Sequence, residues 1–449
     1  MSRLNGFILA FCFLVLLSAN LLAAEPKVIE TEPANGDVNV NPGLRMIRVV
    51  FDQDMDTAGG YSVCGGGSTY PKVLGKPSWQ NKRTFVMRVR LEPNHNYSLS
   101  INCRDYRNFK SENGTSAVPY PVEFKTSSSG STIPEKERER QDNEEALQIL
   151  KEAINKNYSY RDIRGVDWDK LFAEYDGRLK NAKTAREFAK LTAELLVNAK
   201  DKHIWVKADE ENFPCYFKKV SPNANLSKLP EYVENFRKLN NVVCVGKFDD
   251  GVGYIYIDSW PEDQRDMIEP VYEAIWEFAG APGIIIDVRG NGGGAEPLAR
   301  EVAGCFIDER KLYAKHVNRV SGADSGFSDV HERHLEPNKR RPRYRGKTAV
   351  LSGPVVMSSC ESFVLMMKQV PDCKIIGMTT QGSSGNPKPT ELGNGVTVYL
   401  PSWKDLRPDG SCFEGEGIEP DIEIITTDED FENKDPVIDA ALIYIRSQA

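Results

Sequence analysis

The chain has 449 residues and a formal net charge of -8 at pH 7, with 27% charged residues. This length exceeds what a single hydrophobic core usually serves, so at least two domains are expected. The acidic balance argues against nucleic acid as a main partner, because phosphate binding requires a clustered basic surface.

The N-terminus has the pattern of a secretory signal peptide. One arginine precedes an apolar run from Phe7 to about Ala19, and small residues follow up to Ala24. The run is short for a membrane span, so residues 1–24 are predicted to be a signal peptide that is removed. An uncleaved anchor helix is the alternative. No later segment is apolar enough to cross a bilayer, which predicts a periplasmic or extracellular protein without a stable membrane span.

The cysteines are compatible with export. The chain has nine, and eight remain once Cys12 leaves with the signal peptide. An even number permits disulfides in an exported protein, and Cys64 is expected to pair with Cys103 because both lie in the first domain. The sequence has no CxxC spacing, so a zinc site is not expected.

Residues 26–126 are predicted to form a small β-sandwich. Segments such as "MIRVVFDQDMD" and "YPVEFKT" alternate as strands do and have almost no helical periodicity. The stretch "TEPANGDVNVNPGLRMIRVVFDQDMD" resembles bacterial Ig-like modules, which open on a Pro-x-Asn-Gly turn. Such modules act as spacers or adhesive appendages, so adhesion is one candidate function, although it leaves the rest of the chain unexplained.

The remainder is predicted to comprise a linker, a helical subdomain, an α/β core and a C-terminal helix, at residues 127–143, 144–200, 201–430 and 431–449. The linker is rich in Ser, Gly and mixed charges and lacks apolar anchors. Thr184 and Glu187 form a capping box ahead of a helical apolar pattern. Further on, continuous strands such as "GIIIDVRG" alternate with helices, which indicates βα units covering a sheet.

The glycine-rich turn in "GIIIDVRGNGGGAEPLAR" connects a strand to a helix. Its glycines free backbone N–H groups to bind a phosphate or an oxyanion. The turn also fits a relaxed dinucleotide fingerprint, so a dinucleotide-dependent enzyme is a rival. However, no acidic residue closes a second strand about 20 residues on, as that pattern requires. Besides an anion-binding turn and a dinucleotide-binding turn, the third interpretation is a tight turn that binds no ligand.

Ser358 and Ser359 in "VVMSSCESF" stand where a loop enters a helix. They are either N-cap residues, with Glu361 favourable to the helix dipole, or they include a nucleophile. A nucleophilic hydroxyl needs a base, and His203 in "NAKDKHIWVK" follows the capped helix. A lone histidine is more often structural. The other histidines lie in the β-module or in and near an arginine-rich stretch: His95, His316, His331 and His334.

The order of Asp201-x-His203, "IIIDVRGNGGG", "SSCESF", "GMTTQGSSG" and "EGEGIEPDIEI" resembles the tail-specific, or carboxyl-terminal processing, serine peptidases. The resemblance covers about residues 145 to 430. It implies a multidomain protein whose second domain is a crotonase-like or ClpP-like α/β core. Too few residues separate His203 from "GVGYIYI" to hold the PDZ domain that some members insert there.

The resemblance implies that Ser358 is the nucleophile and that the Ser359 N–H is an oxyanion donor. Gly293, with Gly292 as the alternative, matches the second donor. The bacterial processing branch has a lysine base in a Thr-Phe-Gly-Lys motif, but here the corresponding stretch is "TQGS" and ends at Ser383. Ser383 is therefore a further candidate, and the Ser-Lys dyad is excluded.

The absent lysine points to the tricorn-like branch, in which a histidine is the base and a glutamate supports it. His203 matches that histidine and Glu414 that glutamate, with Glu416 as runner-up. Lys202 occupies the place of a serine that bridges the two groups in that branch, and its charge opposes imidazolium formation. Either Glu414 or Asp201 orients His203 directly, or activity is low. Lys202 as the base ranks below His203.

These assignments predict an exported serine endopeptidase that acts on polypeptides through an acyl-enzyme, without a metal or an organic cofactor. The alternative is a weak or inactive family member that binds a peptide or another ligand. The arginines of "KRRPRYRGK" either bind a carboxylate or belong to a disordered loop, and the loop is the favoured interpretation: Arg340, Arg341, Arg343 and Arg345.

Overall fold

A computed structural model describes residues 24–128, 135–320 and 326–447 of the chain. It divides the chain into two compact units, Met1–Pro134 and Glu135–Ala449, and each is described here by itself. The predicted signal peptide lies outside the described residues, apart from Ala24. Across the three described ranges, no helix combines the length and apolarity that a membrane crossing requires.

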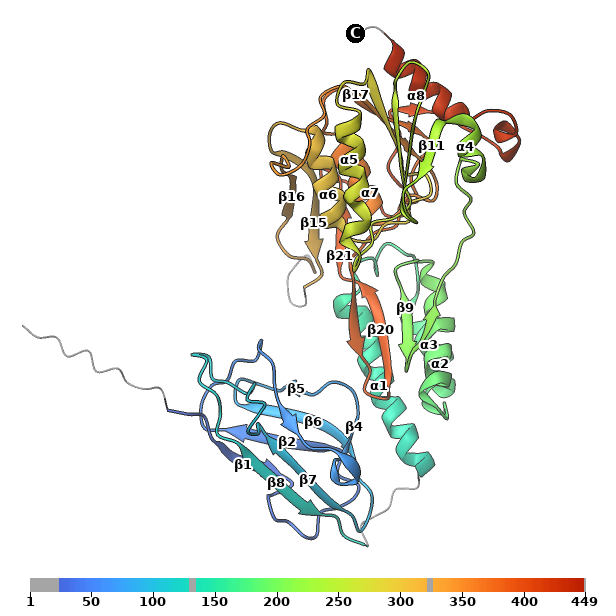
Figure 1. Ribbon diagram of the computed structural model, residues 1–449. Helices are drawn as coiled ribbons and strands as arrows, with labels where there is room; N and C mark the ends of the chain where they lie inside the picture. Colours follow the sequence, from blue (N-terminus) through green and yellow to red (C-terminus); the bar gives the residue numbers. More distant parts are fainter. Residues whose placement is uncertain (1–23, 129–134, 321–325, 448–449) are drawn as a thin grey trace, which may run out of the picture. The chain divides into compact units, whose positions relative to one another are not determined.

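The first unit is all-β, as predicted, and consists of two antiparallel sheets (Figure 1). One sheet has the strand order β1-β2-β6-β4, with β5 also paired to β6, and the other has the order β3-β7-β8. In chain order, β1 to β8 span Val28–Glu32, Met46–Phe51, Val63–Cys64, Lys72–Val73, Ser78–Trp79, Thr84–Arg90, Asn96–Ile101 and Tyr120–Lys125. Alternate residues of β2 and β6 are buried in one apolar core, which explains the alternation seen in the sequence.

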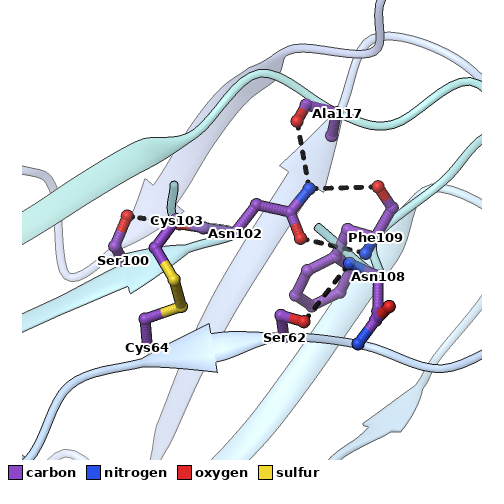
Figure 2. Close-up of a disulfide and its surroundings, with 8 residues drawn as sticks. All are labelled: Ser62, Cys64, Ser100, Asn102, Cys103, Asn108, Phe109 and Ala117. Carbon is purple, nitrogen blue, oxygen red and sulfur yellow. Dashed lines mark hydrogen bonds between the residues drawn. A yellow bond between two sulfur atoms is a disulfide. The ribbon is translucent and has the colours of Figure 1, made fainter. Parts of the chain in front are cut away.

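A disulfide joins Cys64 on β3 to Cys103 directly after β7, which confirms the predicted pair (Figure 2). The neighbouring Asn102 is fully buried in the left-handed region, with φ of 57°. Its side-chain amide donates to the carbonyls of Phe109 and Ala117, at 3.1 and 3.0 Å, and accepts from the Phe109 N–H at 3.0 Å. The disulfide and this amide therefore hold the loop after β7 at two adjacent positions.

The second unit contains a seven-stranded sheet with the order β11-β12-β13-β14-β17-β18-β22 (Figure 1). Its strands span Glu234–Lys238, Val243–Lys247, Gly253–Ile257, Gly283–Asp287, Lys347–Ser352, Cys373–Gly377 and Ile422–Glu423. The pairs from β13 to β22 are parallel, and those from β11 to β13 are antiparallel. Every residue of β13 and β14 is buried, as expected for strands covered on both faces.

Helices cover both faces of this sheet. One apolar core combines it with α5 (Glu269–Glu277), α6 (Glu296–Ala303) and α7 (Ser359–Met367). A second core combines it with α4 (Leu229–Tyr232) and α8 (Pro436–Arg446). A three-stranded sheet, β16-β15-β21, adjoins the first group through contacts between β15 and α7. Its strands span Lys311–Asn318 (β15), His331–Leu335 (β16) and Trp403–Leu406 (β21).

The helical part of this unit is not purely helical. The helices α1 (Glu135–Asn157), α2 (Trp168–Lys180) and α3 (Ala185–Leu196) share an apolar core with a four-stranded sheet of order β10-β9-β20-β19. These strands span Trp205–Ala208 (β9), Glu211–Pro214 (β10), Pro387–Glu391 (β19) and Val396–Pro401 (β20). Residues 387–401, which the sequence suggested to be part of the α/β core, therefore return to pack beside α1 and α3.

The predicted linker, residues 127–143, extends too far. Helix α1 already begins at Glu135, because the mixed-charge run has good helix formers and opposite charges at helical spacing. Arg140 and Glu137 form such a pair, at 3.5 Å. The run was mistaken for a linker because it lacks apolar residues, which first appear in the second half of the helix.

The disulfide generates a prediction about stability. Cys64→Ser should lower the free energy of unfolding of the first unit by about 4 kcal/mol, because the bond closes a loop of 39 residues. Calorimetry of the full chain should show an earlier transition for this unit only. Cys244→Ser, which removes an unpaired cysteine of the second unit, is the control and should leave that transition in place. Equal effects of the two variants would contradict the prediction.

Candidate active site

Ser358 occupies a strained position between β17 and α7. Its backbone has φ of 56° and ψ of -132°, which is unfavourable for a residue with a Cβ atom. Its N–H donates to the Ser383 carbonyl at 2.8 Å and lies 3.2 Å from Glu361 Oε2. Ser358 is also the N-cap residue of α7, so the interpretation as a helix cap and the interpretation as a nucleophile are compatible. A strained backbone held by hydrogen bonds is common at functional sites.

Glu361 is the buried centre of this arrangement. Its carboxylate accepts hydrogen bonds from Thr380 Oγ1 at 2.6 Å, the Gly382 N–H at 2.7 Å and the Ser383 N–H at 3.0 Å. Burial raises the pKa of Glu361 to about 8, and these hydrogen bonds oppose that rise by favouring the carboxylate. The first turn of α7 is thereby tied to the loop that follows β18.

His203 is buried, and its Nδ1 lies 2.9 Å from Ser383 Oγ. A proton on Nδ1 donated to this hydroxyl leaves Nε2 as the proton acceptor. Burial lowers the pKa of His203; the carboxylate of Asp201 opposes this, and the positive charges of Arg164 and Lys202 add to it. The imidazole is therefore neutral at neutral pH, as a general base must be.

The two carboxylates expected to orient His203 are bound to Arg164. The guanidinium lies 3.0 Å from Asp201 Oδ2 and forms an ion pair with Glu414. Asp201 Oδ1 accepts the backbone N–H of His203 at 2.9 Å, and Glu414 Oε2 accepts the Ser384 N–H at 2.8 Å. Among the described residues, the imidazole is therefore held by Ser383, whereas Asp201 and Glu414 hold the backbone on either side of it.

This ionic cluster is deeply buried. Burial raises the pKa of Glu414, and the negative charge of Asp201 raises it further, against the effect of Arg164. Burial opposes the charge on Arg164, but Asp201, Tyr158 and Glu414 together hold its pKa above the usual range. The Tyr158 hydroxyl also donates to Asp201 Oδ2, at 2.8 Å. One guanidinium thus connects the segment before β9 to the segment after β21.

The glycine-rich turn lies directly against the serines. A Cβ atom on Gly293, whose φ is 110°, would come within 2.9 Å of the Ser358 Cβ and 3.3 Å of the Ser359 nitrogen. The Gly293 N–H, however, donates to Asn291 Oδ1 at 2.8 Å, so this expected oxyanion donor is engaged in the structure. Gly292 is exposed. The Ser359 N–H lies in the first turn of α7, where no intrahelical acceptor exists.

His203 and Ser358 line the same cavity, which has a volume of about 670 Å³. Its other lining residues come from the loop after β13, from α6 and the turn before it, from α7, from β9 and β21, and from β19 and the loop before it: Trp205, Glu262, Gly294, Ala295, Glu296, Pro297, Ser359, Ser362, Ser384, Asn386, Pro387 and Trp403. Lys202 is not part of this lining. Glu416 lies at the surface, with its side chain 73% exposed and 3.8 Å from Arg407.

Sequence reasoning brought Ser358, Ser359, His203 and the glycine turn together correctly in one region, but it missed how they are held. Glu361 was interpreted only through the helix dipole, although its place three residues after Ser358 is a capping-box spacing that could have indicated a contact with the Ser358 N–H. Arg164 lies between α1 and α2 in a segment without a motif. Its role depends on contacts far apart in the sequence.

Comparison with known families assigns three regions of the chain. Residues 251–424 match peptidase family S41, residues 139–197 match the tricorn protease C1 domain, and residues 23–126 match a bacterial Ig-like domain. The first two matches lie within the second compact unit, and the third covers the described β-sandwich.

Two carboxy-terminal processing proteases of Bacillus subtilis are similar to part of the chain. CtpA is 28% identical over 174 residues, which cover 39% of this chain and 35% of that protein. CtpB is 25% identical over 173 residues, which cover 38% of this chain and 34% of that protein. The chain therefore spans about a third of the length of these relatives.

The fold is similar to that of a putative peptidase from Parabacteroides merdae. That crystal structure has a TM-score of 0.60 and 25% identity, with 69% of this chain and 98% of the other covered. The crystal structure of mature CPAF has a TM-score of 0.50 and 12% identity to this chain. The match covers 68% of this chain and 97% of the CPAF chain, and at this identity it shows only that the two share a fold.

The buried carboxylate of Glu361 can be tested through stability. At about pH 9, above the raised pKa of Glu361, Glu361→Gln should lower the free energy of unfolding by about 3 kcal/mol, because an amide group cannot accept all the hydrogen bonds that a carboxylate accepts. Chemical denaturation of the full chain measures this. Glu416→Gln makes the same chemical change at an exposed site and should alter stability by less than about 0.5 kcal/mol. A destabilisation of equal size in both variants would refute the role of Glu361.

Proposed function

We propose that this chain is an exported serine endopeptidase that hydrolyses polypeptides through an acyl-enzyme on Ser358, on the basis of the match of residues 251–424 to peptidase family S41. The observation that carries the proposal is the shared cavity of Ser358 and His203 beside the first turn of α7. The core, with its parallel strands and covering helices, is inferred to be crotonase-like.

The proton transfers are assigned to His203. Its Nε2 accepts the proton of the Ser358 hydroxyl as that oxygen attacks the peptide carbonyl, and then returns the proton to the leaving amine. Ser383 accepts the Nδ1 proton and so fixes the tautomer that this step requires. Water then attacks the acyl carbon while His203 takes its proton, and return of that proton to the Ser358 oxygen breaks the ester bond and releases the carboxylic acid product.

The developing oxyanion is placed beside the first turn of α7. The Ser359 N–H is one donor, and the positive end of the helix dipole adds to it. Gly293 can supply the second donor when its N–H leaves Asn291 for the stronger acceptor that an oxyanion presents. Removal of one such donor costs on the order of 10²–10³ in turnover.

Arg164 and its two carboxylates are assigned a positioning role. Asp201 fixes the backbone of His203, and Glu414 fixes the backbone of Ser384, the residue after the hydroxyl that contacts the imidazole. Glu414 thus supports the base through the chain rather than by touching it. Lys202 is placed outside the lining of the cavity, so it is not assigned as a base.

Peptide or ligand binding without hydrolysis is the second candidate function. The engaged Gly293 N–H favours it, because a preformed oxyanion hole would leave that donor free. Covalent chemistry at Ser358 separates the two candidates.

A fluorophosphonate probe should label the full chain but not the Ser358→Ala variant, because the probe reacts with an activated serine hydroxyl. His203→Ala should slow labelling by roughly 10²–10⁴-fold, as expected for loss of a general base. Ser383→Ala should slow it by about tenfold through the loss of one hydrogen bond. Labelling is read by in-gel fluorescence over time. An unlabelled wild-type chain that still binds peptide would favour the second function.

The lowered pKa of His203 predicts the pH profile. Activity falls as pH drops through this pKa, so the acid limb of kcat/KM should lie below the ordinary imidazole value. Lys202→Gln removes a positive charge that lowers the pKa, and the limb should move up by a few tenths of a pH unit. Lys202→Arg keeps the charge and should leave the limb in place. A downward shift in the glutamine variant would contradict the assignment.

A further inference from the structure

A second cavity, of about 620 Å³, lies away from the catalytic serine and is lined mainly by cations. Its lining comes from the turn before α5, from α6, and from the segment after β16: Arg265, Arg300, Glu301, Glu336, Pro337, Asn338, Lys339, Arg340 and Arg341. This cationic cavity contains part of the arginine-rich stretch whose role the sequence left open.

Both carboxylates of the cationic cavity are already neutralised. Glu301 forms an ion pair with Arg265, and Glu336 lies 2.9 Å from Arg310. The Arg341 guanidinium is held by Glu269, at 2.7 Å, and lies 4.1 Å from the centre of the Tyr272 ring. The positive charges that remain in the cavity therefore have no fixed counter-charge.

Three exposed cations supply this excess charge: Arg300, Lys339 and Arg340. Within residues 135–320 and 326–447, none of their side chains has a hydrogen bond or an ion pair. Three uncompensated cations in one concave site raise the local concentration of anions.

The segment that carries two of these cations is fixed in place, so the expectation of a disordered loop is wrong. Asn338 donates its N–H to the Gly304 carbonyl at 2.8 Å and its side-chain amide to the Glu301 carbonyl at 3.0 Å. Further along, the Tyr344 N–H donates to the Cys305 carbonyl at 3.0 Å. These hydrogen bonds hold the segment against the end of α6. Arg341 in addition pairs with Glu269, and Arg343 and Arg345 pair with Asp308.

Helix α6 connects the two cavities. Glu296 and Pro297 of its first turn line the catalytic cavity, and Arg300 and Glu301 of the next turn line the cationic cavity. Residues four apart lie on the same face of a helix and about 6 Å apart along its axis. The linings of the two cavities are therefore about one helical turn apart on α6.

We propose that the cationic cavity is an exosite for an acidic segment of the polypeptide substrate, which places glutamate or aspartate side chains against Arg300, Lys339 and Arg340. The proposal rests on the peptidase function above and adds a substrate class to it. Acidic side chains near the scissile bond then strengthen binding without taking part in the chemistry.

Binding is tested first, in the full chain with Ser358→Ala, so that no hydrolysis is needed. A fluorescein-labelled peptide of alternating Glu and Gly should bind more tightly than its Gln-Gly counterpart, as measured by fluorescence anisotropy. The triple variant R300Q/K339Q/R340Q should weaken binding of the acidic peptide by about tenfold. Raising the salt concentration should reduce the difference between the two peptides.

The matched control removes three exposed lysines of the helical region, K170Q/K183Q/K190Q, and changes the net charge equally. It should leave binding unchanged if the site is local. Equal loss in both triple variants, or equal affinity for both peptides, would overturn the exosite. Unchanged melting temperatures show that the variants fold.

Hydrolysis is tested second, with quenched-fluorescent peptides that carry an acidic or a glutamine extension beside a common cleavable core. R300Q/K339Q/R340Q should raise KM for the acidic peptide alone and leave kcat unchanged. If both peptides bind as predicted but neither is cleaved, the peptidase proposal fails and the anion site stands. If the wild-type chain and the R300Q/K339Q/R340Q variant cleave the acidic and the glutamine peptide equally well, the exosite proposal fails and the peptidase proposal stands.

Discussion

The hydrogen bonds that converge on the Glu361 carboxylate are the constraint on which the site depends. This group lies inside the protein and accepts N–H and O–H donors from the loop after β18, while it also faces the backbone N–H of Ser358. It therefore fixes two segments in register that are separated by a strand. Because Ser383 lies in the fixed loop, its carbonyl meets Ser358 and its hydroxyl meets His203. Ser358 and His203 are thus positioned relative to each other through one buried acid, Glu361.

Two buried ionic clusters extend this rigidity. Arg164 links Asp201 to Glu414, and Arg289, fully buried after β14, bonds to Asp287 at 2.7 Å and to Asp435 at 2.8 Å. The desolvation of such charges cancels much of their attraction, so these pairs contribute little to stability. These pairs fix geometry instead, since a guanidinium donates hydrogen bonds only in its own plane and along fixed directions. One cluster holds the backbone at His203 and Ser384, and the other holds the strand that leads into the glycine turn.

The sequence predicted what depends on local pattern. The alternation of β2 and β6, the continuous apolar runs of β13 and β14, and the motif positions of Ser358 and His203 all lie where expected. It could not predict which partner each polar group takes. Glu414 faces Arg164 instead of the imidazole, and the Gly293 N–H is taken by Asn291, because these contacts depend on how distant segments pack. The predicted linker extended past the true start of α1 at Glu135, because a run of charged residues is compatible with a helix as well as with disorder.

Ser383 stands where the resemblance to the carboxyl-terminal processing peptidases would place a lysine base, and a serine there is electrostatically consistent with the proposed role of His203. A lysine acts as a base only when it is desolvated enough to lose its proton, and at this position its charge would lie beside His203 and lower the imidazole pKa still further. A hydroxyl carries no charge, and it can accept the Nδ1 proton of the ring. In the proposed mechanism the base is the neutral buried imidazole of His203, and Ser383 supports it through this contact. Lys202, the residue before His203 in the chain, lowers the pKa of His203 through its positive charge, so a residue outside the lining of the cavity can still affect the imidazole.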